Sequence, residues 1–334
     1  MDMFDAAVAT VVATRKSAPR PVGSTLTVTR DGKLSGSVSG GCVESDVFVA
    51  AQEVMDTGVP RLVTYGITDD MAFGVGLPCG GEIDVFVEPA GAAAAPVPAD
   101  GERAVVFTVI QGEPLGAKLL VREDGSTAGE GPPGLAALAT DALRRGRGQV
   151  LEHEGRTVFA DVHGPPPTLF VYGAVDTAEA LCGMARQLGW RTVVADARAR
   201  FLTRERIPSA DELVPLWPEE ALEQVRPDTA TAIIVLTHDD KFDLPLLTAA
   251  VKTEAFYIGA LGSRRNQERR RELLREAGLS DEELERISGP SGLDIGAETP
   301  SETALSMLAE ALAVRAGRTG GRLQDSPHRI HAQV

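Results

Sequence analysis

Hydrophobic runs alternate with amphipathic segments through the second half of the chain. Continuous apolar runs such as Ala232–Leu236 are typical of parallel strands buried on both faces, and the segments between them have helical periodicity. The alternation predicts an α/β fold, a Rossmann-type doubly wound parallel sheet, over residues 168–318. The expected strands are Thr168–Gly173, Arg191–Ala195, Glu212–Trp217, Thr231–Thr237 and Ala255–Leu261, and the expected helices are Ala178–Leu188, Glu219–Val225, Leu244–Lys252 and one that begins at the capping box of Thr299 and Glu302.

The first half has shorter apolar strands between glycine-rich turns. We expect a smaller α/β amino-terminal domain over residues 1–164, an internal linker at about residues 89–100, and a domain boundary at the three prolines 165–167. Residues 319–334 lack an apolar face and are expected to form a disordered tail. The elements predicted in the first domain are strands at Ala6–Ala13, Thr25–Thr29, Glu82–Val87, Ala104–Ile110 and Lys118–Arg122 and helices at Cys42–Met55 and Gly134–Arg145.

Composition and charge narrow the class of partner. The chain of 334 residues is long enough for two domains, and its formal net charge of -15 opposes binding to nucleic acid or to an anionic membrane surface. No apolar run is long enough to span a membrane, and the first residues lack the pattern of a secretory signal, so a cytoplasmic location is expected. Three cysteines cannot form a disulfide framework, which leaves burial, metal ligation or thiolate chemistry for them.

The loops that follow the predicted parallel strands carry the candidate ligands of the second domain, because open doubly wound sheets bind at the carboxyl ends of their strands. Gly173 begins a turn into a helix whose free amides could receive a phosphate. However, Val175 stands where a dinucleotide fingerprint has its second glycine, and Asp176 adds negative charge, so classical NAD binding is disfavoured. Asp196 lies at the spacing of a ribose-binding acid or simply caps a strand end.

Two further loops offer chemistry at the same predicted edge. His238 is either a general acid or base or a surface histidine. Gly262, Ser263, Arg264 and Arg265 form either an anion clamp or an ordinary helix start whose arginines face solvent. The glycine-rich loop Ser288–Gly296 is expected to line the cleft.

The first domain concentrates cations and thiols in its turns. Arg15, Arg20 and Ser24 lie in a loop that is locally an anion trap. Cys42 follows a glycine-rich segment at a predicted helix start, where free amides and the helix dipole would stabilise a thiolate as nucleophile or soft metal ligand. Cys79 lies in a second glycine-rich turn. Free cysteines are more often small core residues, and for Cys182, on a buried helical stripe, we expect only packing.

These motifs together resemble the XdhC/CoxI family, accessory proteins that mature molybdenum hydroxylases such as xanthine dehydrogenase and carbon monoxide dehydrogenase. Where many members have Gly-Ala-Gly-His, this chain has Gly-Ala-Val-Asp, which is typical of a subgroup. The resemblance is carried by Ser37–Glu44, Gly76–Gly81, Tyr172–Asp176, Leu236–Asp239, Gly259–Arg265, Gly289–Ala297 and Thr299–Thr303.

The resemblance implies a chaperone for the molybdenum cofactor (molybdopterin), an accessory factor more than a turnover enzyme. Such a protein binds the cofactor, keeps it while a cysteine desulfurase replaces an oxo ligand with sulfur, and hands it to its molybdenum hydroxylase client. A homodimer is also expected. Cys42 is then the molybdenum ligand, and the cofactor-binding set adds Cys79, Arg15, Arg20, Ser24, Gly40, Gly41 and Glu44 in the first domain and Gly173, Asp176, Asp196, Gly262, Ser263, Arg264 and Arg265 in the second.

Two other functions are compatible with the same residues. An NAD(P)-dependent oxidoreductase would use the Rossmann domain and Asp196 to hold its nucleotide, with His238 as acid or base. A nucleotide-sensing interaction protein would use the cysteines only for packing. Fold alone does not decide between these functions, because one fold supports many.

Overall fold

The computed structural model describes residues 4–15, 18, 20–66, 81–91, 96–99 and 101–327. The chain divides into two compact units, the first made of Met1–Pro165 with Ser326–Val334 and the second of Pro166–Asp325. Cys79 and parts of the predicted linker and tail lie outside the described residues, while the described part of the tail includes the short 3-10 helix η2, Leu323–Asp325. Within the described residues, no helix is long and apolar enough to cross a membrane.

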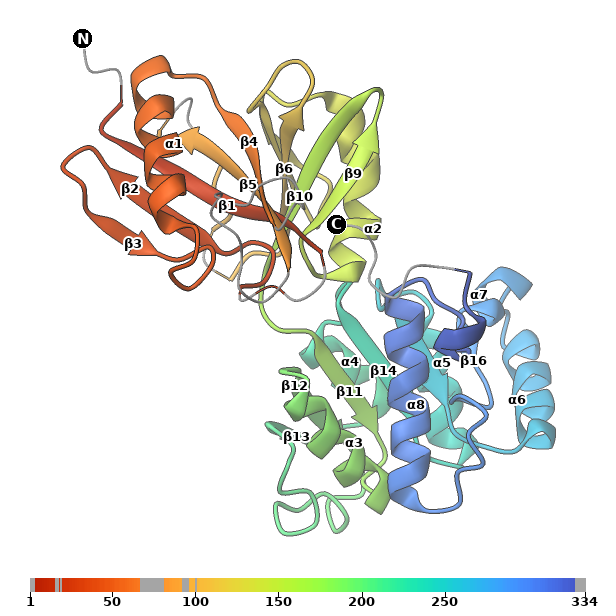
Figure 1. The fold of residues 1–334 in the computed structure, drawn as a ribbon. Coiled ribbons are helices and arrows are strands. Elements are labelled where there is room, and N and C mark those ends of the chain that lie inside the picture. Colours follow the sequence, from red (N-terminus) through yellow and green to blue (C-terminus); the bar gives the residue numbers. More distant parts are fainter. Residues whose placement is uncertain are drawn as a thin grey trace. The chain divides into compact units, whose positions relative to one another are not determined.

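The second unit is built on one fully parallel sheet, here called sheet C (Figure 1). The strand order is β13-β12-β11-β14-β15-β16, so the chain leaves β11 in one direction for β12 and in the other for β14. This is the order of a doubly wound Rossmann sheet and confirms the predicted fold class. The strands are β11 (Thr168–Tyr172), β12 (Arg191–Ala195), β13 (Glu212–Val214), β14 (Thr231–Val235), β15 (Tyr257–Ala260) and β16 (Ile287–Ser288).

Helices cover both faces of sheet C because alternate side chains of each strand point to opposite faces. Helices α3 (Asp176–Gln187) and α8 (Pro300–Arg315) pack on one face around Leu181 and Met307. The opposite face packs on four helices and buries Phe242 and Leu246. These helices are α4 (Pro218–Val225), α5 (Asp240–Ala250), α6 (Arg264–Glu276) and α7 (Asp281–Glu285).

Some helices begin at a different residue from the one that hydrophobic periodicity predicts, because a polar capping residue sets the start. Helix α5 begins at Asp240 rather than at Leu244, because the Asp239 carboxylate accepts a hydrogen bond from the Lys241 amide at 3.2 Å and caps the helix. The capping box predicted at Thr299 is present. The helix expected at Gly134–Arg145 divides into a 3-10 helix η1 (Pro133–Leu138) and α2 (Ala139–Arg145).

The described residues of the first unit form two antiparallel sheets of five strands each. Sheet A has the order β3-β2-β1-β5-β4, and sheet B has the order β8-β7-β6-β10-β9. The strands of sheet A are β1 (Ala6–Arg15), β2 (Thr25–Thr29), β3 (Leu34–Gly36), β4 (Arg61–Gly66) and β5 (Glu82–Pro89). Those of sheet B are β6 (Ala104–Gln111), β7 (Lys118–Arg122), β8 (Thr127–Gly129), β9 (Gln149–His153) and β10 (Arg156–His163).

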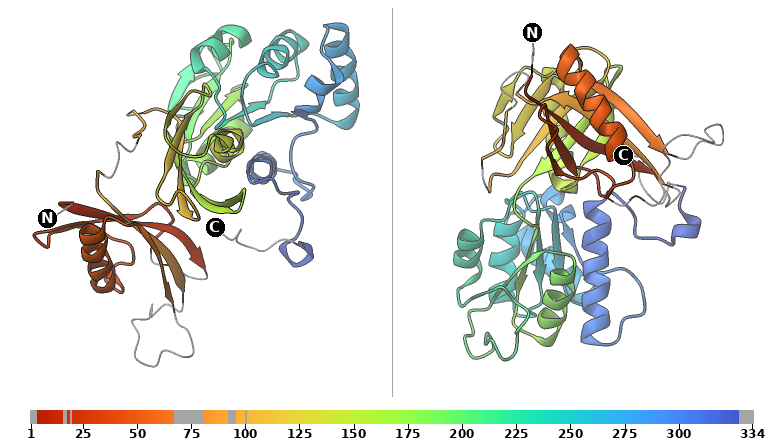
Figure 2. Two further views of the ribbon diagram at one scale, coloured as in Figure 1. Left: turned by 90° about the horizontal axis from the view of Figure 1, so that it is seen from above. Right: turned by 60° about the vertical axis from the view of Figure 1, so that its left-hand side comes forward.

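Each antiparallel sheet packs a helix on one face and the other sheet on its second face. Helix α1 (Glu44–Thr57) buries one face of sheet A, and α2 with η1 buries one face of sheet B. Figure 2 shows α1 on the side of sheet A that faces away from sheet B. A small apolar cluster that includes Val12, Phe86, Ile110 and Phe159 joins the two inner faces.

Candidate functional site

The loop that carries Cys42 is held by one carboxylate, that of Glu44 in the first turn of α1. Glu44 accepts hydrogen bonds from the Ser37 hydroxyl at 2.7 Å, the Ser39 amide at 3.0 Å and the Gly41 amide at 2.9 Å, and also from the Ser39 hydroxyl. Four donors on one carboxylate fix the path of the chain from the end of β3 to the start of α1.

The amides that were expected to be free around Cys42 are engaged, so that part of the prediction is wrong. The Cys42 and Val43 amides both donate to the Ser39 hydroxyl oxygen at 2.9 Å, and the Gly40 amide donates to that of Ser37 at 2.8 Å. Helix α1 starts at Glu44 rather than at Cys42, because these side-chain acceptors satisfy the preceding amides. A sequence signal was available: two serines shortly before a glutamate in a first helical turn.

Cys42 itself is partly exposed. Its side chain packs against the apolar core between sheet A and α1, while Gly40 and Gly41 beside it are exposed. Cys42 is therefore not sealed in the core, and its loop is held by hydrogen bonds within the protein. Cys182, in contrast, is fully buried on the inward face of α3, as predicted for a packing residue, and burial raises its pKa to about 12.

The loop that was expected to trap anions has less free charge than its sequence indicates. Arg15 forms ion pairs with Glu82 and, at 2.7 Å, with Asp84 on the neighbouring strand β5. Arg20 is exposed and Ser24 is half-buried, and Ser24 uses its amide and carbonyl to close the turn onto β1. Among the described residues of this loop, Arg20 is thus a cation that faces solvent, whereas most of the charge of Arg15 is offset by its partners.

In the second unit, Gly173 directly follows β11 at the predicted glycine turn. Its φ is +116°, and a Cβ there would lie 3.1 Å from the Thr237 side chain and 3.2 Å from its amide. Both the conformation and the close approach therefore require glycine. Asp176, at the start of α3, is exposed, and its carboxylate lies 3.7 Å from the Arg206 guanidinium.

Asp196 is buried and committed to partners within the protein. Its carboxylate accepts from the Ala174 amide at 2.9 Å and from the Arg198 amide at 2.9 Å, and it pairs with the Arg198 guanidinium at 2.8 Å. Burial alone would raise the pKa of Asp196, but these hydrogen bonds lower it below its usual value. Arg198 also lies over the Phe201 ring, 4.9 Å from its centroid. The carboxylate thus anchors the glycine turn to the end of β12.

The remaining predicted residues of this edge face solvent. His238 is exposed. Ser263 caps α6 by accepting from the Asn266 amide at 3.2 Å. Arg264 and Arg265 are exposed and form no ion pair within the described residues, so they are free to meet an anion.

Sequence reasoning missed a buried ion pair below this edge. Arg270 of α6 donates to Asp243 of α5 at 2.7 Å and to the Leu261 carbonyl at 3.1 Å, and the Thr237 hydroxyl donates to Asp243. Both charged side chains are almost fully buried. Its neighbours Arg269 and Arg271 are both arginines with more exposed side chains, so the sequence around Arg270 does not indicate that this one is buried.

Two glycines of the loop Ser288–Gly296 have packing roles. A Cβ on Gly289 would collide with the Gln267 side chain, and one on Gly292 would collide with Ser306 of α8. The loop is tied down further by the Gly292 amide, which donates to Glu310 at 2.7 Å. These contacts explain Gly289 and Gly292 by packing, whereas Gly296 has open space around it and a φ of +71°.

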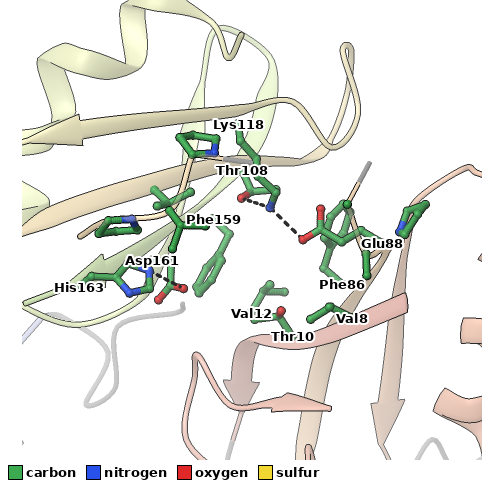
Figure 3. Close-up of a pocket in the computed structure, with 17 residues that line it drawn as sticks. Val8, Thr10, Val12, Phe86, Glu88, Thr108, Lys118, Phe159, Asp161 and His163 are labelled. Carbon is green, nitrogen blue, oxygen red and sulfur yellow. Dashed lines mark hydrogen bonds and ion pairs between the residues drawn. The ribbon is translucent and has the colours of Figure 1, made fainter. Parts of the chain in front are cut away.

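A cavity in the first unit was also missed. It lies between the inner faces of sheets A and B and is lined by the charged residues Glu88, Lys118, Asp161 and His163 (Figure 3). The available signal was the alternation in β10, where Phe159, Asp161 and His163 share one face. Neither here nor in the rest of the described residues is there a group of three or more His, Cys, Asp or Glu side chains that could hold a metal ion.

The fold and site define a class of two-unit protein: a Rossmann sheet joined to an antiparallel unit that presents a cysteine on a preformed glycine-rich loop. Comparison with known proteins agrees with this class. A family model described as the XdhC Rossmann domain matches residues 169–311, and one described as the XdhC and CoxI family matches residues 5–66. This chain belongs to the XdhC and CoxI family.

Relatives of known sequence and structure cover almost the whole chain. The molybdenum cofactor insertion chaperone PaoD of Escherichia coli is 32% identical over 93% of this chain and 83% of its own length. A protein of Bacillus subtilis described as a probable xanthine dehydrogenase subunit is 29% identical over 94% of each chain. A crystal structure from Bacillus halodurans, described as a xanthine dehydrogenase, has a TM-score of 0.55 and 26% identity, and covers 96% of this chain and 94% of its own.

Proposed function

We propose that this protein is a molybdenum cofactor chaperone. It binds the cofactor as cargo, keeps it while a cysteine desulfurase replaces an oxo ligand with sulfur, and delivers it to a molybdenum hydroxylase of the xanthine dehydrogenase or carbon monoxide dehydrogenase type. The observation that carries the proposal is the partly exposed residue Cys42 on the loop held by Glu44. The name of the relative PaoD supports the same role.

The chemistry of the loop suits a carrier. A thiolate is a soft ligand that binds molybdenum and can be exchanged for another ligand at delivery. Because Glu44 and the two serines hold the loop without the cargo, binding costs little ordering entropy, and release does not require the loop to refold. The exposed Arg20 in the neighbouring turn is a candidate partner for the phosphate of the cofactor.

The client enzyme, the cysteine desulfurase and a second copy of this chain are the proposed partners. In this role the protein is an accessory factor that turns over no substrate of its own. The exposed Arg264 and Arg265 of the second unit are proposed to bind an anionic group of the cargo or of a nucleotide.

The test compares two cysteine variants after anaerobic purification from cells that make the cofactor. We expect Cys42→Ala to lower molybdenum and oxidised-pterin content at least tenfold, because it removes the soft ligand. Cys182→Ala is the matched control: it removes a buried thiol and should keep the occupancy of the parent protein. Circular dichroism of all three proteins checks the fold. Equal occupancy in the folded Cys42→Ala variant would defeat the ligand assignment.

A further inference from the structure

The inner faces of sheets A and B do not close completely on each other. They leave a cavity of about 240 Å³ within the first unit, lined by side chains of β1, β5, β6, β7 and β10 (Figure 3). Because side chains alternate between faces, the residues next to those in the two helix-covered cores point into this space. Pockets for drug-sized ligands are about 300–1,000 Å³, so this cavity suits a smaller, bicyclic molecule.

Aromatic and aliphatic side chains form its apolar walls. Phe86 of β5 and Phe159 of β10 come from opposite sheets, and Val12 lies with them in the cluster that joins the sheets. Flat rings gain stacking and burial energy against such walls. The apolar part of the cavity therefore favours a planar ligand over a flexible one.

Two charged pairs lie on either side of Phe159 (Figure 3). Lys118 pairs with Glu88 across the two sheets at 2.8 Å and donates to the Thr108 hydroxyl at 3.0 Å. Both members of this pair are mostly buried, with side-chain exposures of 17%. At the other end His163 lies 3.1 Å from an oxygen of Asp161.

These pairs leave acceptors rather than free cations in the cavity. Lys118 and His163 each meet one oxygen of a carboxylate, while the second oxygen of Glu88 and that of Asp161 accept no hydrogen bond within the described residues. An anion such as a phosphate would meet two carboxylates and is disfavoured. A neutral ring with neighbouring N–H donors is favoured, because a carboxylate can accept two such donors side by side.

From this geometry we propose that the cavity binds the 2-amino-4-oxo-pyrimidine edge of a pterin, with Asp161 as the acceptor of its ring N–H and amino group and with Phe86 and Phe159 against its faces. The inference rests on the proposed function, since the cargo carries a pterin. It assigns the heterocycle to the first unit, apart from the thiol that meets the metal.

Binding of free pterins to the full chain tests this assignment without the metal. Neopterin is titrated by fluorescence, and 6-substituted lumazine, which has an oxo group in place of the amino group, is the matched ligand. We expect neopterin to bind at least tenfold more tightly than the lumazine. Equal binding of the two, or binding of neither, would overturn the edge recognition.

Two variants locate the site. Asp161→Asn should weaken neopterin binding at least tenfold and abolish the preference over lumazine, and Thr10→Phe should block the cavity from its wall on β1. Asp141→Asn, on α2 and away from the cavity, is the control and should bind as the parent protein does. Unchanged neopterin binding in both folded cavity variants would contradict the proposal.

The proposed function is tested by a separate measurement, the molybdenum content of protein purified from cells. Cys42-dependent loading together with a failure to bind neopterin would remove the cavity assignment alone. Neopterin binding that needs Asp161, in a protein that never carries molybdenum, would retain the cavity and remove the chaperone role.

Discussion

At the scale of single residues, Glu44 determines the shape of the loop around Cys42. It gathers donors from Ser37, Ser39 and Gly41 and forms no ion pair within the described residues that would compete with them. Burial alone would raise the pKa of Glu44, but the hydrogen bonds from Ser39 and Ser37 outweigh it and lower the pKa from 4.5 to about 2. The carboxylate is thus ionised, and binds the loop, at all physiological pH values.

Glu44→Gln should destabilise the first unit in a pH-dependent way. A carboxyl group whose pKa is lower in the folded than in the unfolded protein stabilises the fold above its unfolded value near 4.5, and this contribution is lost as the pH falls toward 2. We expect a loss of about 1–2 kcal/mol in the free energy of unfolding at pH 7, allowing for solvent screening of this partly exposed group. Urea denaturation at pH 7 and pH 3 measures it.

The control for this prediction is Glu130→Gln, at an exposed carboxylate outside the loop. It should leave the stability unchanged at both pH values. If Glu44→Gln proved as stable as the parent protein at pH 7, the loop would not depend on the carboxylate, and the preformed carrier loop would lose its basis.

At the scale of elements, two neighbouring arginines of α6 have opposite roles. Arg270 pairs with Asp243 in the interior, whereas Arg269 pairs with Asp240 at the surface. Both aspartates belong to α5, so both pairs connect the same two helices. The sequence shows three consecutive arginines there but does not indicate which of them is buried. The packing of α6 on α5 decides that.

Arg270→Met should lower the free energy of unfolding by about 3–5 kcal/mol, because it leaves the Asp243 carboxylate buried without its partner. Arg269→Met removes the same type of residue one position earlier and should have little effect, since its pair is exposed. Chemical denaturation of the two variants gives the comparison. Similar losses in both would show that burial does not distinguish the two pairs.

At the scale of the whole molecule, the glycine turn of the Rossmann unit departs from the dinucleotide fingerprint that an oxidoreductase would use. Asp196, which would bind the ribose, uses its carboxylate on Ala174 and Arg198, and Val175 replaces the glycine that lets a pyrophosphate approach. His238 is exposed at the same edge.

Titration with NAD and NADP by calorimetry should therefore show weak binding or none, and mixing the protein with NADH or NADPH should produce no hydride transfer to added carbonyl compounds. Val175→Gly is an informative variant, because it restores the fingerprint glycine while Asp196 stays engaged. It should still bind poorly. Micromolar binding by the parent protein together with hydride transfer would favour the oxidoreductase instead.

The sequence by itself determined the features that depend on local order along the chain. Hydrophobic runs predicted the parallel strands of sheet C, Thr299 and Glu302 predicted the start of α8, and the motifs around Cys42 and Gly173 predicted the family. Helical and strand periodicity and capping act over a few residues, so they can be seen without the fold.

The tertiary structure decided which charges are free. Glu88 meets Lys118 thirty residues later in the chain, Asp243 meets Arg270 across two helices, and the cavity exists only because sheets A and B face each other. Sequence spacing does not encode such partners, because the distance between two side chains depends on the packing of elements that lie far apart in the chain. Burial then determines whether a charge holds the fold together or remains free to bind.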